Sequence, residues 1–338
     1  MSENSLTIFS AIEFSEAQWG RLRAVCPGVR VVQVPTRDVK VVRSSVREAD
    51  VAVVYHDQDF DPALAPRLKW VQTTSAGVEA FVGGKLWNSE VPIVNASGVA
   101  AAPIAEHAIA MVLALRHRLP YLWERQKEHA WAWRDPRARS MGELAGLTLG
   151  VIGYGSIGRE VGRLGKAFGM RLIATTIDAS ARRDTGFSLA VGDPEGALPE
   201  VLGGPELQED LLRQSDVVVV AVPSTPATRR LLGESAFGAM KPMAILVNVS
   251  RGSVVDEAAL VRALREGRIG GAALDVFEKE PLPADSPLWE LPNVLVSPHV
   301  AAESPGYWER LMSLLVENVR RTHAGEPLVN VVDKQLAF

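Results

Sequence analysis

The stretch LTLGVIGYGSIG, residues 147–158, decides the fold predicted for this sequence. Its first half, Leu147 to Ile152, is an apolar run of strand length, and apolar residues at helical spacing follow its second half. Three glycines lie between the strand and the helix: Gly153, Gly155 and Gly158. They permit a tight turn, a close approach of the backbone to a pyrophosphate, and close packing of the helix, whose first N–H groups lack intrahelical partners. The stretch therefore predicts a dinucleotide-binding turn in a parallel α/β sheet and leaves NAD, NADP and FAD open.

The composition is that of a globular protein with more than one domain. The chain has 338 residues, of which 47% are hydrophobic and 22% are charged, and its formal net charge is -4. Two domains of ordinary size are expected at this length. The charge balance offers no basic surface to nucleic acid or to an anionic membrane, and the start MSENSLTIFS carries no targeting pattern. We therefore expect a cytoplasmic protein without a nucleic-acid or membrane partner, and the single cysteine, Cys26, excludes an internal disulfide.

Apolar runs of strand length alternate with helical segments along the whole chain, which predicts the α/β class with parallel sheets. A first series of five strands is expected at Leu6–Ile12, Arg30–Val34, Val51–Tyr55, Leu68–Thr73 and Pro92–Asn95. A second series of six strands is expected at Leu147–Ile152, Met170–Ile177, Val217–Val222, Ala244–Val249, Gly271–Val276 and Val294–Ser297. Each series is long enough for a doubly wound sheet of its own.

Helical patterns precede, separate and follow these strands. They are expected at Glu16–Val25, from Pro103 to about Trp133, and from Tyr307 to about His323. The tail at Leu328–Val332 is strand-like. The stretch Asp193–Pro205 is rich in glycine and proline and is expected to be a surface loop.

Polar residues follow the last three strands of the second series. Arg251 follows the fourth strand, Glu280 the fifth and His299 the sixth. Ligands of an open parallel sheet bind at the carboxyl ends of the strands, so these side chains are expected to converge there. A histidine can protonate the alkoxide that hydride transfer to a ketone leaves, a carboxylate can orient that imidazole, and an arginine can bind a carboxylate. The trio therefore predicts hydride transfer to an oxo acid.

Three segments around these residues resemble successive motifs of one enzyme family. The segments Val247–Leu260, Ala273–Leu282 and Ser297–Ala301 are similar to those of the D-isomer-specific 2-hydroxyacid dehydrogenases, and the similarity covers almost the whole chain. The resemblance implies a substrate-binding domain formed by residues 1–102 and 303–338. It also implies an inserted Rossmann-type dinucleotide-binding domain formed by residues 103–302, with the active site in the cleft between the two domains.

The resemblance also implies roles for individual residues. Arg251 would bind the substrate carboxylate and carbonyl, His299 would be the acid and base, and Glu280 would be its partner. The turn Ser75-Ala76-Gly77 would bind the substrate carboxylate through its backbone N–H groups. The positions that correspond to cofactor contacts are Gly153, Tyr154, Gly155, Ser156, Ile157, Gly158, Val222, Pro223, Val249 and Asp275.

The end of the second strand of the dinucleotide-binding domain departs from NAD-preferring relatives. Thr176 stands where those relatives place the acid that binds the ribose 2′-hydroxyl. Asp178 lies two residues further and can take over this contact, whereas Arg182 or Arg183 can meet the 2′-phosphate of NADP. We expect NADP to be used at least as well as NAD, unless Asp178 turns back to the ribose, in which case NAD is preferred.

These observations predict an oxidoreductase that moves a hydride between NAD or NADP and a small 2-oxo acid, of the glyoxylate or hydroxypyruvate type, to give the D-2-hydroxy acid. Two alternatives remain open. One is a formate-type dehydrogenase, whose members place glutamine where Glu280 stands. The other is a dinucleotide-sensing binding protein of the same fold. The family also implies a homodimer, with the helix that starts near Pro103 packed across it.

Other polar and aromatic residues are expected to be structural. The acidic cluster Asp57–Asp61 lacks the glycine and the terminal glutamate of a calcium loop, so no metal site is expected. His107 is expected to be structural because the trio already supplies a base. Core or interface packing is expected of Trp123, Trp131 and Trp133.

Overall fold

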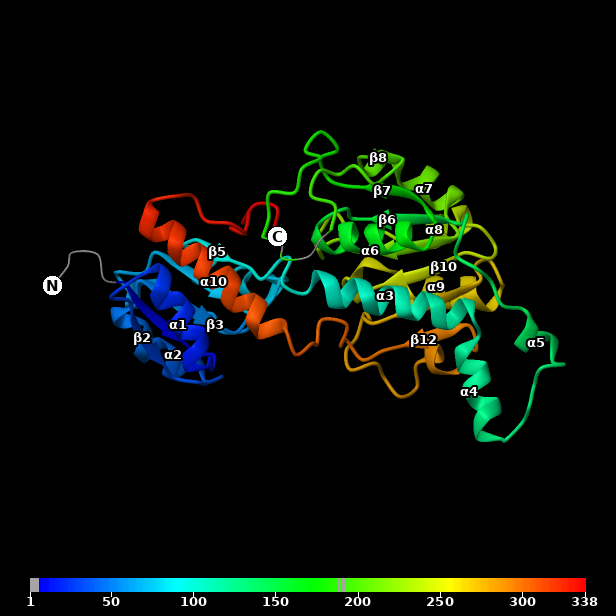
Figure 1. Ribbon diagram of the computed structural model, residues 1–338, viewed down its shortest axis with the longest axis horizontal. Coiled ribbons are helices and arrows are strands. Elements are labelled where there is room, and N and C mark those ends of the chain that lie inside the picture. Colours follow the sequence, from blue (N-terminus) through cyan, green and yellow to red (C-terminus); the bar gives the residue numbers. More distant parts are fainter. Residues whose placement is uncertain (1–5, 188, 190–191) are drawn as a thin grey trace. The chain divides into compact units, whose positions relative to one another are not determined.

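The structure, a computed structural model, describes residues 6–187, 189 and 192–338 (Figure 1). The chain forms two compact units: the first comprises Met1–Ala100, Thr185–Leu189 and Ser304–Phe338, and the second comprises Ala101–Asp184 and Ala190–Glu303. The sequence predicts Thr185–Leu189 in the second domain, whereas this segment belongs to the first unit. The reason is that Phe187 packs against the first unit's core and donates its backbone N–H to Asn330 Oδ1, 2.9 Å away.

The first unit contains a sheet of five parallel strands. Its elements are β1 Thr7–Ser10, α1 Glu16–Val25, β2 Arg30–Gln33, α2 Val39–Ser45, β3 Val51–Val54, β4 Trp70–Thr73, β5 Ile93–Val94 and α10 Tyr307–Ala324. The strand order is β2-β1-β3-β4-β5. Successive side chains on a strand point to opposite faces, so the sheet separates two apolar cores. Ile8 of β1 belongs to the core that contains residues of α1 and α10, and its neighbour Phe9 belongs to the core that contains Val42 of α2.

The second unit contains a sheet of seven parallel strands. Its strands are β6 Thr148–Ile152, β7 Arg171–Thr175, β8 Val201–Gly203, β9 Val217–Val220, β10 Ile245–Asn248, β11 Gly271–Leu274 and β12 Val294–Val296. Its helices are α3 Ala101–Arg116, α4 Leu119–Lys127, α5 Pro136–Arg139, α6 Ser156–Ala167, α7 Gln208–Gln214, α8 Glu234–Ala239 and α9 Glu257–Arg265. The strand order is β12-β11-β10-β9-β6-β7-β8, so the direction of winding reverses between β6 and β9. Helices α3 and α6 contribute to one apolar core of this sheet, and α7, α8 and α9 contribute to the other (Figure 1).

The α/β class with two parallel sheets is confirmed, and α1 has the predicted bounds. The helix predicted from Pro103 to Trp133 is wrong in its length, because Arg118 adopts a left-handed conformation with φ of 56° and the separate helix α4 begins after it at Leu119, with Pro120 in its first turn. The loop predicted at Asp193–Pro205 contains a seventh strand, β8, whose Gly203 pairs with Thr175 of β7. The predicted tail strand is reduced to an isolated antiparallel bridge between Val331 and Val94. Within the described ranges, no helix is long and apolar enough to cross a membrane.

Candidate active site

The glycine-rich turn lies at the point where the winding of the seven-stranded sheet reverses. Gly153, directly after β6, has φ of +99°, and a Cβ atom there would lie 2.7 Å from the carbonyl oxygen of Ala221, which follows β9. A Cβ atom on Gly158 would overlap the carbonyl oxygen of Gly153. Both positions therefore require glycine, one for its conformation and the other for the approach of α6 to the turn. This is the place where open parallel sheets bind a dinucleotide.

The N-terminus of α6 is open. Gly155 is its N-cap residue and makes no side-chain capping hydrogen bond, and a Cβ atom at Gly155 would find no atom within 4 Å in the described structure. The N–H groups of the first helical turn, which includes Ser156, Ile157 and Gly158, therefore face a space that glycine leaves free. This geometry fits the pyrophosphate of a dinucleotide, because a helix N-terminus attracts anions and the missing side chain lets them approach the backbone.

Tyr154 connects the glycine-rich turn to neighbouring parts of the second unit. Its ring is buried, its backbone N–H donates to the carbonyl of Thr175 at 2.8 Å, and its hydroxyl donates to Asp193 Oδ2 at 2.7 Å. Burial raises the pKa of the Tyr154 phenol above its usual value, and the hydrogen bond to Asp193 adds to this effect. The side chain thus fastens the loop around Asp193 to the turn. The expected cofactor contact of Tyr154 remains a prediction.

The segment after β7 contains the residues expected near the ribose. Thr176 follows β7 directly and donates its N–H to the carbonyl of Gly203 at 3.0 Å. Asp178 accepts hydrogen bonds from Ser180 Oγ at 2.6 Å and from Ser180 N–H at 2.9 Å, and these lower the pKa of its carboxyl group. The carboxylate of Asp178 is therefore used within its own turn. Arg182 and Arg183 are exposed.

Four further residues expected at the cofactor follow the next strands. Val222 and Pro223 come after β9, Val249 after β10 and Asp275 after β11. All four therefore lie at the carboxyl edge of the sheet, which is the edge that contains the glycine turn. Val249 and Asp275 are almost fully buried.

His299 and Glu280 form a hydrogen-bonded pair at this edge. His299 Nδ1 lies 2.7 Å from Glu280 Oε2, and Glu280 Oε1 accepts the backbone N–H of Phe277 at 3.0 Å. The two side chains are 44% and 35% exposed, so the pair is accessible to a small molecule. The carboxylate can fix the orientation of the imidazole and leave Nε2 available for proton exchange.

Arg251 follows β10, and its loop packs closely against the loop that leads to Glu280. A Cβ atom on the next residue, Gly252, would overlap the backbone of Phe277. The guanidinium Nη1 of Arg251 donates to the carbonyl of Ser250 at 2.8 Å, and Asn248 Nδ2 donates to the carbonyl of Arg251 at 3.0 Å. These hydrogen bonds lie within the loop of Arg251, and the close approach of Gly252 to Phe277 places that loop beside the loop from which Glu280 projects.

The backbone of His299 is strained. Its φ of 55° lies in the left-handed region, where a non-glycine residue costs about 1–3 kcal/mol and persists only when its surroundings hold it. The carboxylate of Asp275, 2% exposed, accepts the N–H groups of Val300 and Ala301, each at 3.0 Å, and the hydroxyl of Ser297 at 2.6 Å. From the sequence, Asp275 is expected only as a cofactor contact. Its hydrogen bonds to the loop of His299, and the hydrogen bond from Ser297, are not predicted.

The turn Ser75-Ala76-Gly77 belongs to the first unit and follows β4. Ser75 Oγ accepts the N–H of Gly77 at 3.1 Å, and the carbonyl of Ser75 accepts the N–H of Ala96 at 2.9 Å. Ala76 is exposed. The side-chain hydrogen bond stabilises a tight turn with exposed backbone, as the sequence predicts for this segment. Its contact with substrate remains a prediction.

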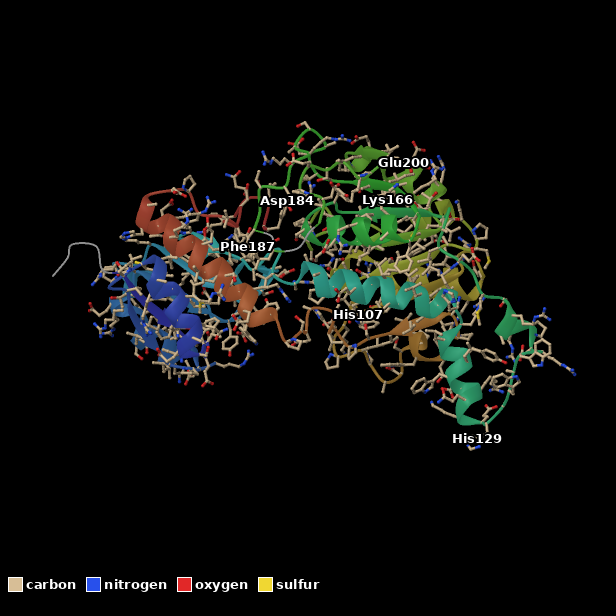
Figure 2. The ribbon with its side chains drawn as sticks, viewed as in Figure 1. His107, His129, Lys166, Asp184, Phe187 and Glu200 are labelled. Carbon is tan, nitrogen blue, oxygen red and sulfur yellow. The ribbon has the colours of Figure 1, made fainter. Side chains whose placement is uncertain are left out.

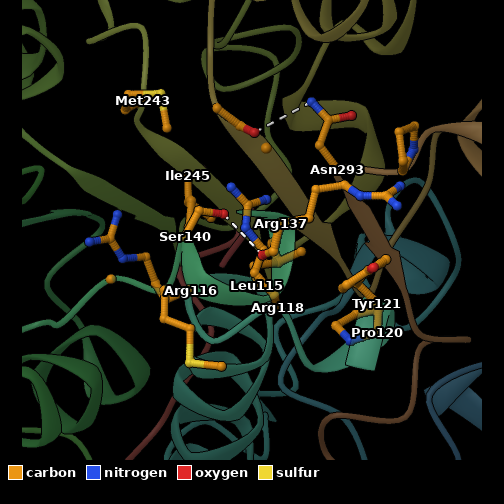
Figure 3. A pocket seen from close by; sticks show the side chains of 15 residues that line it. Leu115, Arg116, Arg118, Pro120, Tyr121, Arg137, Ser140, Met243, Ile245 and Asn293 are labelled. Atoms are coloured by element: carbon orange, nitrogen blue, oxygen red, sulfur yellow. Dashed lines mark hydrogen bonds between the residues drawn. The ribbon is translucent and has the colours of Figure 1, made fainter. Parts of the chain in front are cut away.

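A cavity of about 430 Å³ opens at the opposite edge of the seven-stranded sheet (Figure 3). It is lined by residues at or before the amino ends of three strands, namely Ile245 of β10, Gly271 of β11 and Asn293 before β12, and by Leu115 and Tyr121 near the junction of α3 and α4. The predicted catalytic side chains follow the carboxyl ends of the same strands. This cavity is therefore not the candidate active site.

A glycine turn at the winding reversal, with a histidine–carboxylate pair and an arginine after neighbouring strands, defines a dinucleotide-dependent oxidoreductase. Residues 109–301 match the family model described as D-isomer specific 2-hydroxyacid dehydrogenase, NAD binding domain. The glyoxylate reductase of Aeropyrum pernix is 36% identical over 301 residues, which cover 87% of this chain and 85% of that protein. The chain therefore belongs to the D-isomer-specific 2-hydroxyacid dehydrogenase family.

Solved structures agree with this assignment. A D-isomer specific 2-hydroxyacid dehydrogenase from Xanthobacter autotrophicus, in complex with NADPH and MES, matches with a TM-score of 0.77 and 30% identity, over 99% of this chain and 100% of that one. The NADPH-dependent glyoxylate/hydroxypyruvate reductase of Sinorhizobium meliloti, in complex with NADP and sulfate, matches with a TM-score of 0.74 and 27% identity, over 99% and 100%. The protein is an oxidoreductase that acts on the CH–OH group of a small 2-hydroxy acid, or on the corresponding 2-oxo acid, with NAD or NADP.

Proposed function

We propose that the enzyme reduces glyoxylate, hydroxypyruvate or a similarly small 2-oxo acid to the D-2-hydroxy acid, with His299 as the proton donor. The observation that carries this proposal is the 2.7 Å contact between His299 Nδ1 and Glu280 Oε2. Reduction turns the carbonyl oxygen into an alkoxide, which needs a proton near neutral pH, and a protonated imidazole oriented by a carboxylate can deliver it from Nε2. When bound, the dinucleotide supplies the hydride to the carbonyl carbon.

In this proposal the substrate carboxylate is bound by Arg251 and by the backbone N–H groups of the turn Ser75-Ala76-Gly77. A guanidinium can bind a planar carboxylate with two parallel hydrogen bonds, which orients the adjacent carbonyl. The same positive charge stabilises the developing alkoxide. Oxidation of the hydroxy acid is the reverse process, with His299 as the base.

The substrate class is tested by a panel of 2-oxo acids. We expect kcat/KM for glyoxylate or hydroxypyruvate to exceed that for a bulky 2-oxo acid such as phenylpyruvate by about 10-fold or more, because differences in pocket fit give discrimination of this order. A bulky 2-oxo acid as the best substrate would overturn the proposal. Formate with NAD⁺ should give no turnover, because Glu280 stands where formate dehydrogenases of this family place glutamine.

The role of Arg251 is tested by its replacement with lysine. Arg251→Lys keeps the charge but loses the bidentate hydrogen bonds to the carboxylate. We therefore expect kcat/KM for the oxo acid to fall by about 10-fold or more, with most of the loss in KM. The matched control is Arg171→Lys, at the amino end of β7, where Arg171 pairs with Glu200. An Arg251→Lys enzyme as active as the wild type would show that Arg251 does not bind the substrate.

We further propose that NADPH is used at least as well as NADH. The carboxylate of Asp178 is bonded to Ser180 within its own turn, and Thr176 is not acidic, so neither residue offers a carboxylate reserved for the ribose 2′-hydroxyl of NAD. The relatives from Xanthobacter autotrophicus and Sinorhizobium meliloti were solved with NADPH and NADP.

The cofactor proposal predicts two measurements. Asp178→Asn, which keeps an acceptor for Ser180, should change the ratio of kcat/KM for NADPH and NADH by less than about 3-fold, because no carboxylate contact to the ribose is lost. Arg182→Gln combined with Arg183→Gln should raise KM for NADPH only. A wild-type preference for NADH of about 100-fold or more would refute the proposal.

We also propose that the enzyme is a homodimer in the cytoplasm and that it does not bind nucleic acid or membranes. The support for the dimer is the segment of α4 and α5, residues 119–139, where Trp123, Trp131 and Trp133 are 61%, 90% and 60% exposed. Three exposed indoles on one short segment are typical of an interaction site. Sedimentation velocity of the wild type and of Trp131→Glu tests the dimer. The variant should dissociate into monomers at a higher protein concentration than the wild type, and a monomeric wild type would overturn the proposal.

A further inference from the structure

The loop that carries His299 is fixed to α3 by a chain of polar contacts. His107, which projects from α3 (Figure 2), has Nε2 at 2.9 Å from Ser297 Oγ and at 3.7 Å from Asp275 Oδ1. Ser297 Oγ in turn lies 2.6 Å from Asp275 Oδ1. The carboxylate of Asp275 accepts the N–H groups of Val300 and Ala301, and its backbone carbonyl accepts the N–H of His299 at 2.8 Å. The chain therefore runs from α3 to both sides of His299.

Counting protons fixes the direction of each hydrogen bond. Ser297 has one hydroxyl proton, and the short contact to Asp275 Oδ1 uses it, since a carboxylate is a far better acceptor than the sulfur of Met111, 3.7 Å away. The remaining contact at Ser297 Oγ then needs a donor, which must be the Nε2–H group of His107. In the other neutral tautomer, Nε2 would compete with Asp275 for the serine proton, and the carboxylate would lose one of its donors.

The position of α3 does not depend on His107. The helix packs on the sheet through Ala105, Ala108, Met111 and Val112, which belong to the apolar core of β6, β7, β9 and β10. The side chain of His107 is 28% exposed, and its polar contacts in the described structure are those to Ser297 and Asp275. Its removal should therefore disturb the loop much more than the fold.

We propose that His107 is a positioning residue for the reaction: its Nε2–H holds Ser297 against Asp275, and Asp275 holds His299 in the left-handed conformation that presents its ring to Glu280. This inference rests on the proposed role of His299 as the acid and base. It assigns His107 a function that its place on a mixed helix does not reveal.

The first test compares two replacements of His107. His107→Gln retains an N–H donor at the right distance along the side chain, whereas His107→Leu fills similar space without a donor. We expect His107→Leu to lower kcat for 2-oxo acid reduction by about 10- to 100-fold, with KM for the dinucleotide changed by less than about 3-fold, and His107→Gln to restore most of the loss. His117→Leu, in the turn after α3, is the matched control. Equal activity of the leucine and glutamine variants, high or low, would overturn the inference.

The second test uses a double variant. His107→Leu and Ser297→Ala break the same chain, so the double variant should lose no more kcat than the worse single variant. Losses that multiply would show that the two residues act separately, which would also overturn the inference.

The third test reports on His299 without turnover. In protein labelled at histidine ¹³Cε1, the signal of His299, one of six histidines, is assigned by its absence in His299→Ala. We expect His107→Leu to shift or broaden this signal and His107→Gln to leave it near its wild-type position. An unchanged signal in His107→Leu would overturn the positioning role. A fully active His299→Ala enzyme would instead overturn the proposed proton donor, so the two failures are distinguishable.

Discussion

The N-terminus of α1 in the first unit and that of α6 in the second differ in one respect. Both helices follow the first strand of a parallel sheet. α1 is closed by a capping box, in which Ser15 Oγ accepts the N–H of Gln18 at 3.3 Å and Gln18 Oε1 accepts the N–H of Ser15 at 2.8 Å. α6 starts at Gly155, which offers no side chain. Two similar sheets therefore differ at the helix that follows the first strand, because side chains cap the start of α1 and no side chain caps the start of α6.

The same contrast extends to the residues after the strands. At the end of β1, Ser10 Oγ donates to the carbonyl of Ile12 and accepts its N–H, so the serine is satisfied within its own turn. After β11 and β12, Glu280 and His299 remain 35% and 44% exposed while bonded to each other. The polar groups of the second unit are thus prepared to interact with a further molecule. The following predictions test this difference between the units.

The largest effect is expected from the histidine in the second unit. His299→Ala should lower kcat for 2-oxo acid reduction by about 10²- to 10⁴-fold, the usual contribution of a general acid, while the dinucleotide dissociation constant stays within about 3-fold. Stopped-flow reduction and fluorescence titration measure the two quantities. The control is His323→Ala, on α10 of the first unit, which should behave like the wild type. Normal turnover by His299→Ala would show that the histidine of the second unit is no more important for the reaction than His323 of the first unit.

A smaller effect is expected when α6 receives the kind of cap that α1 has. Gly155→Ser should weaken dinucleotide binding by about 10-fold or more, because the new hydroxyl competes for the N–H groups and the side chain occupies the approach to the backbone. Its melting temperature should not fall, since a Cβ atom there meets nothing within 4 Å and φ is −88°. Titration calorimetry and thermal unfolding test this pair of expectations.

A matched glycine serves as the control for this variant. A Cβ atom at Gly20 in α1 would also meet nothing within 4 Å, so Gly20→Ser makes the same change in the first unit. It should leave dinucleotide affinity unchanged. If Gly155→Ser bound the dinucleotide like the wild type, the open end of α6 would not be the phosphate site.

Acid should affect one glutamate of each unit in opposite directions. Hydrogen bonds from Arg320, and then from Arg321, lower the pKa of Glu317 on α10 to about 2, so its contribution to stability is present above pH 4.5 and is lost as pH falls toward 2. In the second unit, burial and then the nearby carboxylates of Glu278 and Glu280 raise the pKa of Glu257. Protonation of Glu257 therefore stabilises the folded protein relative to the unfolded chain.

Glu317→Gln measures the contribution from the first unit. The variant should be less stable than the wild type by on the order of 1 kcal/mol at pH 7, and the difference should shrink between pH 5 and pH 3. Glu309→Gln, on the same helix, is the control, because its exposed pair with Arg21 should contribute little at any pH. A difference for Glu317→Gln that stays constant with pH would contradict the assignment.

The smallest effect is expected from the capping box of α1. Ser15→Ala should lower the free energy of unfolding by about 1 kcal/mol, and the melting temperature by about 2–4 °C, because the N–H of Gln18 loses its acceptor. The kinetic constants should not change. A loss of dinucleotide affinity in this variant would mean that the first unit takes part in cofactor binding, contrary to the comparison.

Elements whose ends are marked by capping and turn residues could be predicted from the sequence. Both ends of α1 could be predicted, because Ser15 and Gln18 have the spacing of a capping box and Pro27-Gly28 follow the last turn. β8 was not predictable, since its three residues stand among glycines and prolines and become a strand only by pairing with β7. The break before α4 also escapes prediction, because an arginine rarely adopts the left-handed conformation of Arg118.

The candidate site shows the same division. The meeting of Glu280 and His299 could be predicted because the carboxyl ends of neighbouring parallel strands lie at one edge. The contact of His107 with Ser297 could not, since 190 residues separate them and no periodicity connects them. The engagement of Asp178 by Ser180 is a short-range turn whose residue types were visible, but two outcomes for that aspartate were compatible with them.

The five residues Thr185–Leu189 have a consequence for the modularity of this protein. A nucleotide-binding module is transferred most simply when it is one continuous stretch of chain, with one entrance and one exit. Here the second unit is interrupted, because Phe187 packs against the core of the first unit and its N–H is bonded to Asn330. A fragment cut at residues 101 and 303 would carry an orphaned phenylalanine into solvent. A chimera that exchanges this module must therefore also keep the first-unit surface against which Phe187 packs, or replace the segment Thr185–Leu189.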